Sequence, residues 1–534
     1  MKNAKYLFWL IALIPIFLMR DIAKGNELTY LSIAEQALRN GNFFAFYNHG
    51  AIYADKPPLY IWLVMLGERF WNGHCMIWMG LFSLIPSFLI LHIMDKWTTP
   101  IIDKDYRSAG QWLLLTTGMF LSATIVIRMD MLMTLFIVLS LYTFYKMYSE
   151  GITRKRRVLL PLYIFLALFT KGPFGLLIPL LSIFFFLLIE KRGKEIKRYL
   201  GWTTWGILFG LSAIWLFMVY SEGGSVYLNN LLFHQTMGRA FGAFIHRNGF
   251  FYYFVTLPYS MAPWIILYIY LIWKGIHKKR LVFPLQRFFL TITTVTFILL
   301  SCVSSKIEIY LLPAYPFIVF LCASLMRESE KDLGVFIGLI APAFGYCLAL
   351  PTMIFFKVQH LLLNWQTPFM FAASAIVSLV GLITVVQLIK DRNRSCNGAM
   401  KPANTENSDI WNRYVCKLSV APLFALMIAS GSLPKVNVDI GYSRLSEEIR
   451  DISQQNDVHF YCCYHVKNGS ALDYYLHTPI VEIPKHHFEQ VKEIHKPYIL
   501  VIPTKYLYNE QTINNYLNYS RRYQDGPYEL FICR

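Results

Sequence analysis

Residues Lys24–Pro58, KGNELTYLSIAEQALRNGNFFAFYNHGAIYADKPP, form the stretch on which the rest of the chain is organised. One apolar run precedes this stretch and further apolar runs follow it. It is too polar to lie in lipid, yet it is rich in the aromatic side chains typical of a membrane interface. It carries Asn26 and Glu27 near its start and Asp55 and Lys56 near its end. We therefore expect a loop at the membrane surface that forms the floor of an active site.

The composition of the whole chain is that of a membrane protein. Of its 534 residues, 56% are hydrophobic and only 15% are charged, whereas about 25% of the residues of a soluble chain are charged. The net charge of +18 comes from short basic runs between apolar runs, which argues against a nucleic acid partner. The N-terminus is basic and then apolar, without a small-residue cleavage site, so we expect a first membrane anchor there.

The apolar runs predict an all-α polytopic membrane protein with about thirteen transmembrane helices. The expected spans are residues 6–23, 75–94, 110–127, 131–148, 158–170, 173–189, 200–220, 251–273, 288–303, 308–326, 334–356, 368–389 and 414–430. Two of these spans are separated only by Lys171 and Gly172, and Pro173 begins the second, which fits a tight turn at the membrane surface. Within the first loop, we expect surface helices at Glu27–Asn40 and Pro58–Trp71.

Lysine and arginine are concentrated in one alternate set of loops, for example at Arg154–Arg157. By the positive-inside rule, this set and the N-terminus face the cytoplasm. The opposite face then carries the loops 24–73 and 221–250 together with the C-terminal tail. We therefore expect a transmembrane domain at 1–430 and a soluble extracytoplasmic α/β domain at 435–534.

The expected tail domain has its own secondary-structure pattern. Residues 443–455 and 488–494 read as helices, and residues 459–464, 498–503 and 529–533 read as short strands. Three cysteines fall in this segment: Cys462, Cys463 and Cys533. A disulfide among them and free thiols packed in the strands are both compatible with the sequence.

Ionisable and tyrosine side chains gather at the span ends of the expected outer face. They are Glu27, Tyr53, Asp55, Lys56, Arg128, Asp130, Lys171, His234, Arg239, Lys306, Glu308 and Tyr310. Such a mixed cluster suits a phosphorylated lipid substrate, because Lys and Arg neutralise phosphate. A carboxylate would then activate the acceptor, or a metal would polarise the phosphate.

Several of these residues also have simpler structural explanations. Asn26 is a good helix N-cap, and Glu27 in the first turn of a helix favours the helix dipole. Lys56 fits a snorkelling interfacial lysine, and Asp130 fits a boundary charge pair. His234 has the simpler explanation of an ordinary loop histidine, and Tyr53 and Tyr310 that of aromatic-belt residues. Their occurrence together is what favours a functional site.

The segments around these residues carry a family resemblance. GNELTYLSIAEQALRNGNF (25–43) and YADKPPLYIWL (53–63) resemble the first outer loop of membrane glycosyltransferases that use polyprenyl-phosphate sugars. The resemblance continues at 127–134, 168–180, 233–241, 250–264 and 304–316. It is strongest to the bacterial aminoarabinose transferases of lipid A, with the protein O-mannosyltransferases more distant. These enzymes have the GT-C fold.

The resemblance implies a binding site for the phosphate of the lipid donor. Tyr53, Lys56, Arg239 and Tyr310 would bind the phosphate, with Lys306 close by.

The resemblance also implies a divalent-metal site and a pair of acidic residues. Asp55 and His234 match the metal site, where zinc or magnesium would bind. Asp130 matches a second acidic position, but Asn26 stands where the family usually has the first acid of an Asp-Glu pair. Because an amide cannot act as a general base, three alternatives remain. Glu27 or Asp130 takes the catalytic role, the acceptor is already nucleophilic, or the activity is altered.

The implied activity is the inverting transfer of a sugar from a polyprenyl-phosphate donor to a cell-envelope acceptor. A lipid A-type glycolipid is the leading acceptor, followed by protein or another surface glycan. The expected location is the outer face of the bacterial inner membrane, with donor, acceptor and membrane lipid as partners and no nucleic acid. The alternatives are a transporter or flippase of a lipid-linked sugar, and a membrane scaffold. Transporters tend to show repeats and midplane charges, whereas this chain shows no fixed repeat.

Overall fold

The protein is described from a computed structural model. The structure describes residues 4–71, 76–238, 248–329, 332–361, 363–396, 408–507, 513, 516–517 and 521–534. The chain forms two compact units. The first, which we call the helical unit, comprises Met1–Pro15, Ala54–Tyr60 and Trp78–Ala429. The second, which we call the mixed unit, comprises Ile16–Tyr53, Ile61–Ile77 and Ser430–Arg534.

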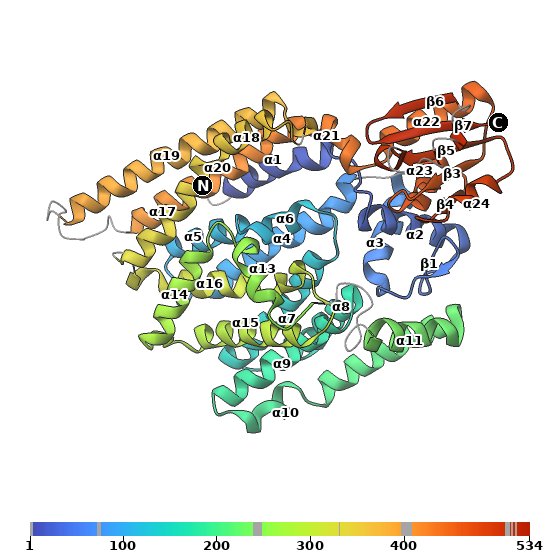
Figure 1. Ribbon diagram of the computed structural model, residues 1–534. Coiled ribbons are helices and arrows are strands. Elements are labelled where there is room, and N and C mark those ends of the chain that lie inside the picture. Colours follow the sequence, from blue (N-terminus) through green and yellow to red (C-terminus); the bar gives the residue numbers. More distant parts are fainter. Residues whose placement is uncertain are drawn as a thin grey trace. The chain divides into compact units, whose positions relative to one another are not determined.

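The helical unit contains the apolar helices (Figure 1). They are α1 (Ala4–Met19, whose last turn belongs to the mixed unit), α4 (Met76–Thr98), α5 (Lys104–Leu115), α6 (Gly118–Ile125), α7 (Asp130–Glu150), α8 (Arg154–Lys171), α9 (Pro173–Ile189), α10 (Ile196–Tyr199), α11 (Trp202–Asn229), the π-helix η2 (Asn230–Gly238), α13 (Tyr252–Ser260), α14 (Ile265–His277), α15 (Pro284–Cys302), η3 (Glu308–Ala314), α16 (Tyr315–Leu325), α17 (Leu333–Cys347), α18 (Ala349–Val358), α19 (Pro368–Cys396) and α20 (Ser408–Ala429). Short 3-10 turns lie at Gly193–Glu195, Arg327–Ser329 and Leu363–Trp365.

The predicted polytopic helical architecture is confirmed. Among the described residues, eight helices are long and apolar enough to cross a membrane, or nine if the bent pair α13 and α14 forms one span. The shorter apolar helices α1 and α9 occupy two further positions at which spans were expected.

Not every expected span is one continuous helix. The run 110–127 is divided between α5, which ends at Leu115, and α6, which begins at Gly118. The run 251–273 is not one straight helix, because α13 and α14 meet at a bend of 116°. Pro263 lies in the break between them. Proline has no amide hydrogen and its ring clashes with the preceding turn, so a helix does not continue through it undisturbed.

The predicted tight turn at Lys171–Pro173 is confirmed. Helix α8 ends at Lys171, and α9 begins at Pro173, where the fixed backbone of proline suits a first helical residue. Gly172 joins them with a φ of 105°, which favours glycine because it has no Cβ. The turn holds Lys171 at the end of the helix pair.

The mixed unit combines the first loop with the tail. Its elements are α2 (Asn26–Asn40), β1 (Tyr47–Asn48), β2 (Ala51–Ile52), most of α3 (Pro58–Trp71), η6 (Ser430–Ser432), α21 (Leu433–Ile440), α22 (Ser443–Asn456), β3 (Tyr461–Tyr464), η7 (Gly469–Leu472), α23 (Asp473–Leu476), β4 (Ile480–Ile483), α24 (Glu489–Lys492), β5 (Tyr498–Pro503), α25 (Thr504–Leu507), β6 (Arg521–Asp525) and β7 (Tyr528–Cys533). Gly41 ends α2 in the left-handed conformation, which glycine adopts readily because it has no Cβ.

The tail forms a five-stranded sheet in the order β4-β3-β5-β7-β6. Strand β3 is parallel to β4 and β5, whereas β7 is antiparallel to β5 and β6. The three predicted strands are confirmed as β3, β5 and β7, and the predicted helix at 443–455 is confirmed as α22. The two edge strands β4 and β6 were missed. Strand β6 (RRYQD) has no apolar pattern, and β4 (IVEI) is apolar but only four residues long.

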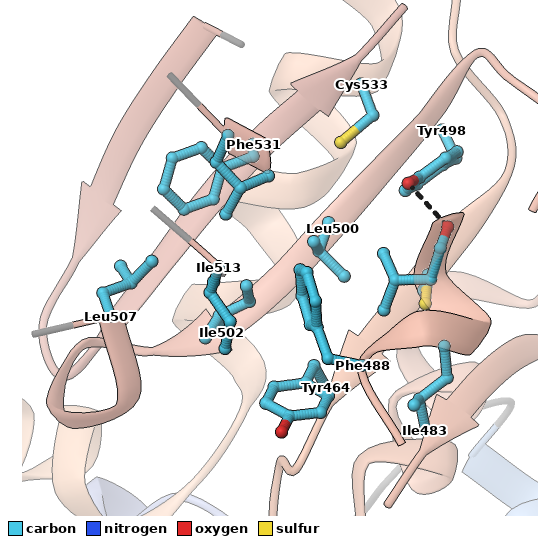
Figure 2. Close-up of a cluster of buried hydrophobic side chains, with 13 residues drawn as sticks. Tyr464, Ile483, Phe488, Tyr498, Leu500, Ile502, Leu507, Ile513, Phe531 and Cys533 are labelled. Carbon is cyan, nitrogen blue, oxygen red and sulfur yellow. Dashed lines mark hydrogen bonds between the residues drawn. The ribbon is translucent and has the colours of Figure 1, made fainter. Parts of the chain in front are cut away.

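One face of this sheet supports a hydrophobic core (Figure 2). The Phe488 ring packs there against the ring of Tyr464 in β3, with centroids 5.2 Å apart, and the Tyr498 hydroxyl donates a hydrogen bond of 3.0 Å to the backbone carbonyl of Val491. Cys462 and Cys533 lie in the same core, and neither is in a disulfide. Cys463 is also a buried free thiol, so in this structure the three cysteines are packing residues.

Two buried charged residues connect the first loop to the tail within the mixed unit. The Lys24 ammonium donates to the Val438 carbonyl at 3.0 Å and to the Tyr528 hydroxyl at 3.2 Å. The Asp21 carboxylate accepts hydrogen bonds from the Ser443 amide at 3.0 Å and from its hydroxyl at 2.7 Å. Burial lowers the pKa of Lys24 to about 8, although nearby carboxylates oppose the shift. The loop is thus fixed to the tail by polar contacts.

A third link joins the β1–β2 hairpin to α23. His49 Nδ1 lies 3.0 Å from a carboxylate oxygen of Asp473. The hydrogen bond with Asp473 raises the pKa of His49, burial opposes the shift, and the charges of Asp473 and Glu482 add to it. The protonated imidazole therefore stabilises the hairpin against the tail.

We predict that protection of the hairpin from amide exchange decreases with rising pH. A raised folded-state pKa means that the stabilisation is complete below the ordinary histidine pKa of about 6.5. It is lost as the pH rises through the folded-state value. Hydrogen exchange of residues 47–52, corrected for intrinsic rates, should be up to about fivefold faster at high pH, the size of an ion pair worth up to ~1 kcal/mol.

The variant His49→Gln should lose this pH dependence and remain at the less protected level. The exposed His459, which pairs with exposed Asp457, offers the matched control His459→Gln, which should behave like the unsubstituted protein. Equal corrected protection of the hairpin at low and high pH would contradict the prediction.

Candidate active site

The centre of the candidate site is a buried carboxylate held by two cations in the helical unit. Asp130 is the first residue of α7 and is only 1% exposed. Arg128 Nε lies 3.0 Å from one carboxylate oxygen, and the Lys171 ammonium binds the other. Helices α7 and α8 pack against each other, so the start of α7 meets the end of α8. Asp130 is therefore part of a buried ionic network rather than an exposed boundary pair.

Two further predicted residues adjoin this network. The Lys171 ammonium lies 4.3 Å from the ring centroid of Tyr310, a cation–π contact. Lys56 is close enough to act electrostatically on Lys171, as is Arg128. Lys56 also pairs with Asp55 at 2.9 Å, and both of these side chains are partly exposed.

We call this set the basic cluster: Asp55, Lys56, Arg128, Asp130, Lys171 and Tyr310. It contains three cations and two carboxylates, so it carries excess positive charge. Ammonium and guanidinium groups with excess positive charge are suited to binding a phosphate group.

Lys306 has a structural role in this part of the helical unit. It is 2% exposed, and its ammonium donates to the backbone carbonyls of Asn248, at 3.0 Å, and Val303. The Asn248 side chain donates in return to the Lys306 carbonyl at 3.1 Å. Nearby, Glu308 accepts hydrogen bonds from the hydroxyls of Tyr252 and Tyr259. Phosphate binding by Lys306 stays a prediction.

Asn26, Glu27 and Tyr53 belong to the mixed unit. Gly25 rather than Asn26 is the N-cap of α2, and Asn26 is exposed in the first turn. Glu27 is 2% exposed; one of its carboxylate oxygens lies 2.8 Å from Arg20, and the other accepts the Ala23 amide at 2.9 Å. Glu27 is therefore tied to the chain that leads into its own helix.

Tyr53 is half-buried in the first loop, and its backbone amide donates to the Phe46 carbonyl at 2.9 Å. This bond continues the pairing of β1 and β2, so Tyr53 marks the end of the hairpin. The predicted phosphate-binding residue Arg239 lies outside the described residues. The roles assigned to Tyr53 and Arg239 stay predictions.

The expected metal ligands do not form a metal centre in the described part of the chain. No three His, Cys, Asp or Glu side chains there are grouped so that they could hold a metal ion. Asp55 is engaged by Lys56, and His234 is exposed within η2. A zinc or magnesium site stays a prediction, and no catalytic step is derived from it.

Sequence reasoning paired Arg128 with Asp130 only as a boundary charge pair and gave no individual role to Lys171, although both cations were expected at the same membrane face. The signal for Lys171 was its place at a helix end before Gly172 and Pro173. The signal for Arg128 was its spacing of two residues from Asp130. Neither pattern shows that both cations bind the same carboxylate, because that contact joins separate helices.

No family model matches the sequence. An uncharacterized protein of Aquifex aeolicus is 26% identical over 344 residues, which span 60% of this chain and 64% of that protein. An undecaprenyl phosphate-alpha-4-amino-4-deoxy-L-arabinose arabinosyl transferase of Pectobacterium atrosepticum is 22% identical over 451 residues, which span 81% of this chain and 76% of the enzyme.

Among solved structures, ArnT from Cupriavidus metallidurans bound to undecaprenyl phosphate matches with a TM-score of 0.74 and 16% identity. The match covers 99% of this chain and 98% of ArnT. The apo structure of the same enzyme gives a TM-score of 0.75. This chain therefore has the fold of ArnT, with many apolar helices and an α/β C-terminal region. The fold expected from the resemblance in the sequence is thereby confirmed.

The ionic network predicts a large and specific stability effect. The substitution Asp130→Ala leaves Lys171 buried without its carboxylate. This should lower the free energy of unfolding by about 3–5 kcal/mol. Thermal unfolding of the purified protein, monitored by size-exclusion chromatography, should show a strongly lowered midpoint temperature.

The double variant Asp130→Leu/Lys171→Met removes both charges and should recover at least half of this loss. The matched control is Asp95→Ala, because Asp95 pairs with Arg107 at 3.0 Å but is more exposed; it should cost at most about 1 kcal/mol. If Asp130→Ala and Asp95→Ala lowered the free energy of unfolding equally, the network would be energetically unimportant.

Proposed function

We propose that the protein transfers a sugar from a polyprenyl-phosphate donor to a cell-envelope acceptor. The observation that carries this proposal is the fold match along nearly the whole of both chains to an enzyme that binds undecaprenyl phosphate. The basic cluster supports it, because excess positive charge at the helix ends suits a lipid phosphate. A lipid A-type glycolipid is the leading acceptor, and protein or another surface glycan is the next.

In the proposed reaction, an oxygen of the acceptor attacks the anomeric carbon of the donor sugar. The bond between that carbon and the phosphate oxygen breaks, and the lipid phosphate leaves with the bonding electron pair. A single displacement inverts the anomeric centre. Lys56 and Tyr310, with Arg239, would bind this phosphate. Charge that develops on the leaving phosphate is stabilised by fixed cations more strongly than the ground state is.

The state of the carboxylates bears on which acceptor is used. Both oxygens of Asp130 are bound by cations, and those of Glu27 are bound by Arg20 and a backbone amide. A general base must reach the proton that it removes. An acceptor that is already ionised, such as a phosphate of a glycolipid, needs no such base. The contacts that occupy the Asp130 and Glu27 carboxylates therefore favour an acceptor that is already ionised over a neutral hydroxyl.

The proposed location is the outer face of the bacterial inner membrane, with the N-terminus in the cytoplasm and residues 435–534 outside. The distribution of lysine and arginine supports this orientation. Donors attached to a lipid then reach the site through the membrane, without a cytoplasmic nucleotide sugar.

The phosphate-binding role of Lys56 leads to a direct test. We expect Lys56→Ala to lower sugar transfer by about 10- to 100-fold, the effect of losing one or two hydrogen bonds to a charged group. The measurement is transfer by purified protein from a synthetic polyprenyl-phosphate sugar. Mass spectrometry of lipid A and glycoproteins from cells with and without the gene should identify the acceptor.

The control for Lys56→Ala is Lys155→Ala, an exposed lysine at the start of α8, which should transfer normally. Wild-type turnover by a folded Lys56→Ala protein would remove Lys56 from the phosphate site. Unchanged glycan profiles in the two cell strains would contradict sugar transfer itself and favour transport of the lipid-linked sugar.

Asn26 provides a second test of the reaction. Because its amide is exposed at the start of α2, Asn26→Asp can be accommodated without a buried charge. If the acceptor is already ionised, activity should stay within about twofold or rise, measured with the same transfer assay. Complete loss of transfer in the folded variant would show that the amide itself contributes.

A further inference from the structure

A groove between the last two long helices of the helical unit lies away from the basic cluster. Helices α19 and α20 pack side by side (Figure 1). The groove between them has a volume of about 690 Å³. Its apolar walls include Ile376, Val380 and Ile383 of α19 and Val420 and Phe424 of α20. Ile383 and Phe424 are partly exposed, so the groove opens at the surface of the unit.

The surroundings of this groove are expected to be lipid. Both helices belong to stretches that are long and apolar enough to cross a membrane. Lining residues 413 to 424 follow one stripe of α20, which corresponds to about 16 Å at a rise of 1.5 Å per residue. That length is close to one leaflet of a hydrocarbon core of about 30 Å. The groove therefore matches an acyl chain lying along the helices.

One end of the groove carries positive charge. Arg413 and Lys417 both line it and lie four residues apart, on one face of α20. Lys417 donates a 2.6 Å hydrogen bond to the Gln387 side chain, which is neutral. Within the described residues, neither cation has a carboxylate within ion-pair distance. The nearby Asp391 instead accepts a hydrogen bond from Tyr414.

We propose that this groove binds an anionic phospholipid. One acyl chain occupies the apolar walls, and Arg413 and Lys417 bind the phosphate headgroup. Charge complementarity selects the ligand, because two cations that have no carboxylate partner among the described residues, at the mouth of an apolar groove, favour a net negative headgroup over a zwitterionic one. This site is separate from the proposed sugar transfer and does not depend on it.

The test compares two lipids on the full-length protein in detergent. Native mass spectrometry with added phosphatidylglycerol or phosphatidylcholine measures how many lipids stay bound and with what affinity. Phosphatidylglycerol should bind more tightly than phosphatidylcholine. The double variant Arg413→Gln/Lys417→Gln should weaken phosphatidylglycerol binding by roughly tenfold, given two cations near the headgroup.

The matched control is Arg154→Gln/Arg157→Gln, which removes two exposed arginines at the start of α8 and should leave lipid binding unchanged. If the first double variant fails to fold, Ile383→Trp fills the groove without changing charge and should displace the tightly bound lipid. Charge-conserving Arg413→Lys/Lys417→Arg should retain it. Equal affinity for both lipids, or retention of phosphatidylglycerol by the groove-filled variant, would overturn the proposal.

Discussion

The arrangement of this protein depends on burying charged residues only where they have partners. Asp21 and Lys24 enter the mixed unit from the first loop, and each finds polar partners on the tail segment more than four hundred residues later. An unpartnered charge in a buried position is far too costly to retain. These partners therefore determine that the first loop and the tail fold as one unit, even though a run of helices separates them in the sequence.

The same rule shapes the candidate site. Asp130 is buried because Arg128 and Lys171 bind its two oxygens, and Lys171 is buried because Asp130 and the Tyr310 ring face it. The network fixes its members in place before any substrate arrives. Preorganised cations of this kind stabilise developing negative charge without paying for reorganisation at the moment of reaction. Arg128 and Lys56 keep 21% and 16% of their side chains exposed, more than Lys171, so these two cations of the basic cluster are best placed to meet a ligand.

Much of the fold was predictable because its signals are local. Apolar runs of sufficient length mark the helices, Gly172 and Pro173 mark a turn, and the apolar strands β5 and β7 stand out from their surroundings. Edge strand β6 lacks that pattern and edge strand β4 is too short to stand out, so both were missed. For the site, the sequence placed Lys56, Asp130 and Tyr310 at one face. It could not show that Lys171 joins them, because that contact depends on how separate helices pack, nor that Glu27 is engaged by Arg20.

The buried cysteines of the tail have a consequence for how this chain meets oxidants. A thiol reacts through its thiolate form, and burial raises the pKa of Cys462 to about 12, so the thiolate is scarce while the sheet is intact. The closed core also keeps oxidants away from Cys533. In an oxidising compartment, chains that fold quickly would keep reduced cysteines, whereas chains that linger unfolded would form wrong disulfides. In such a compartment, the fraction of chains with a disulfide among these cysteines would therefore rise with the time that the chains spend unfolded.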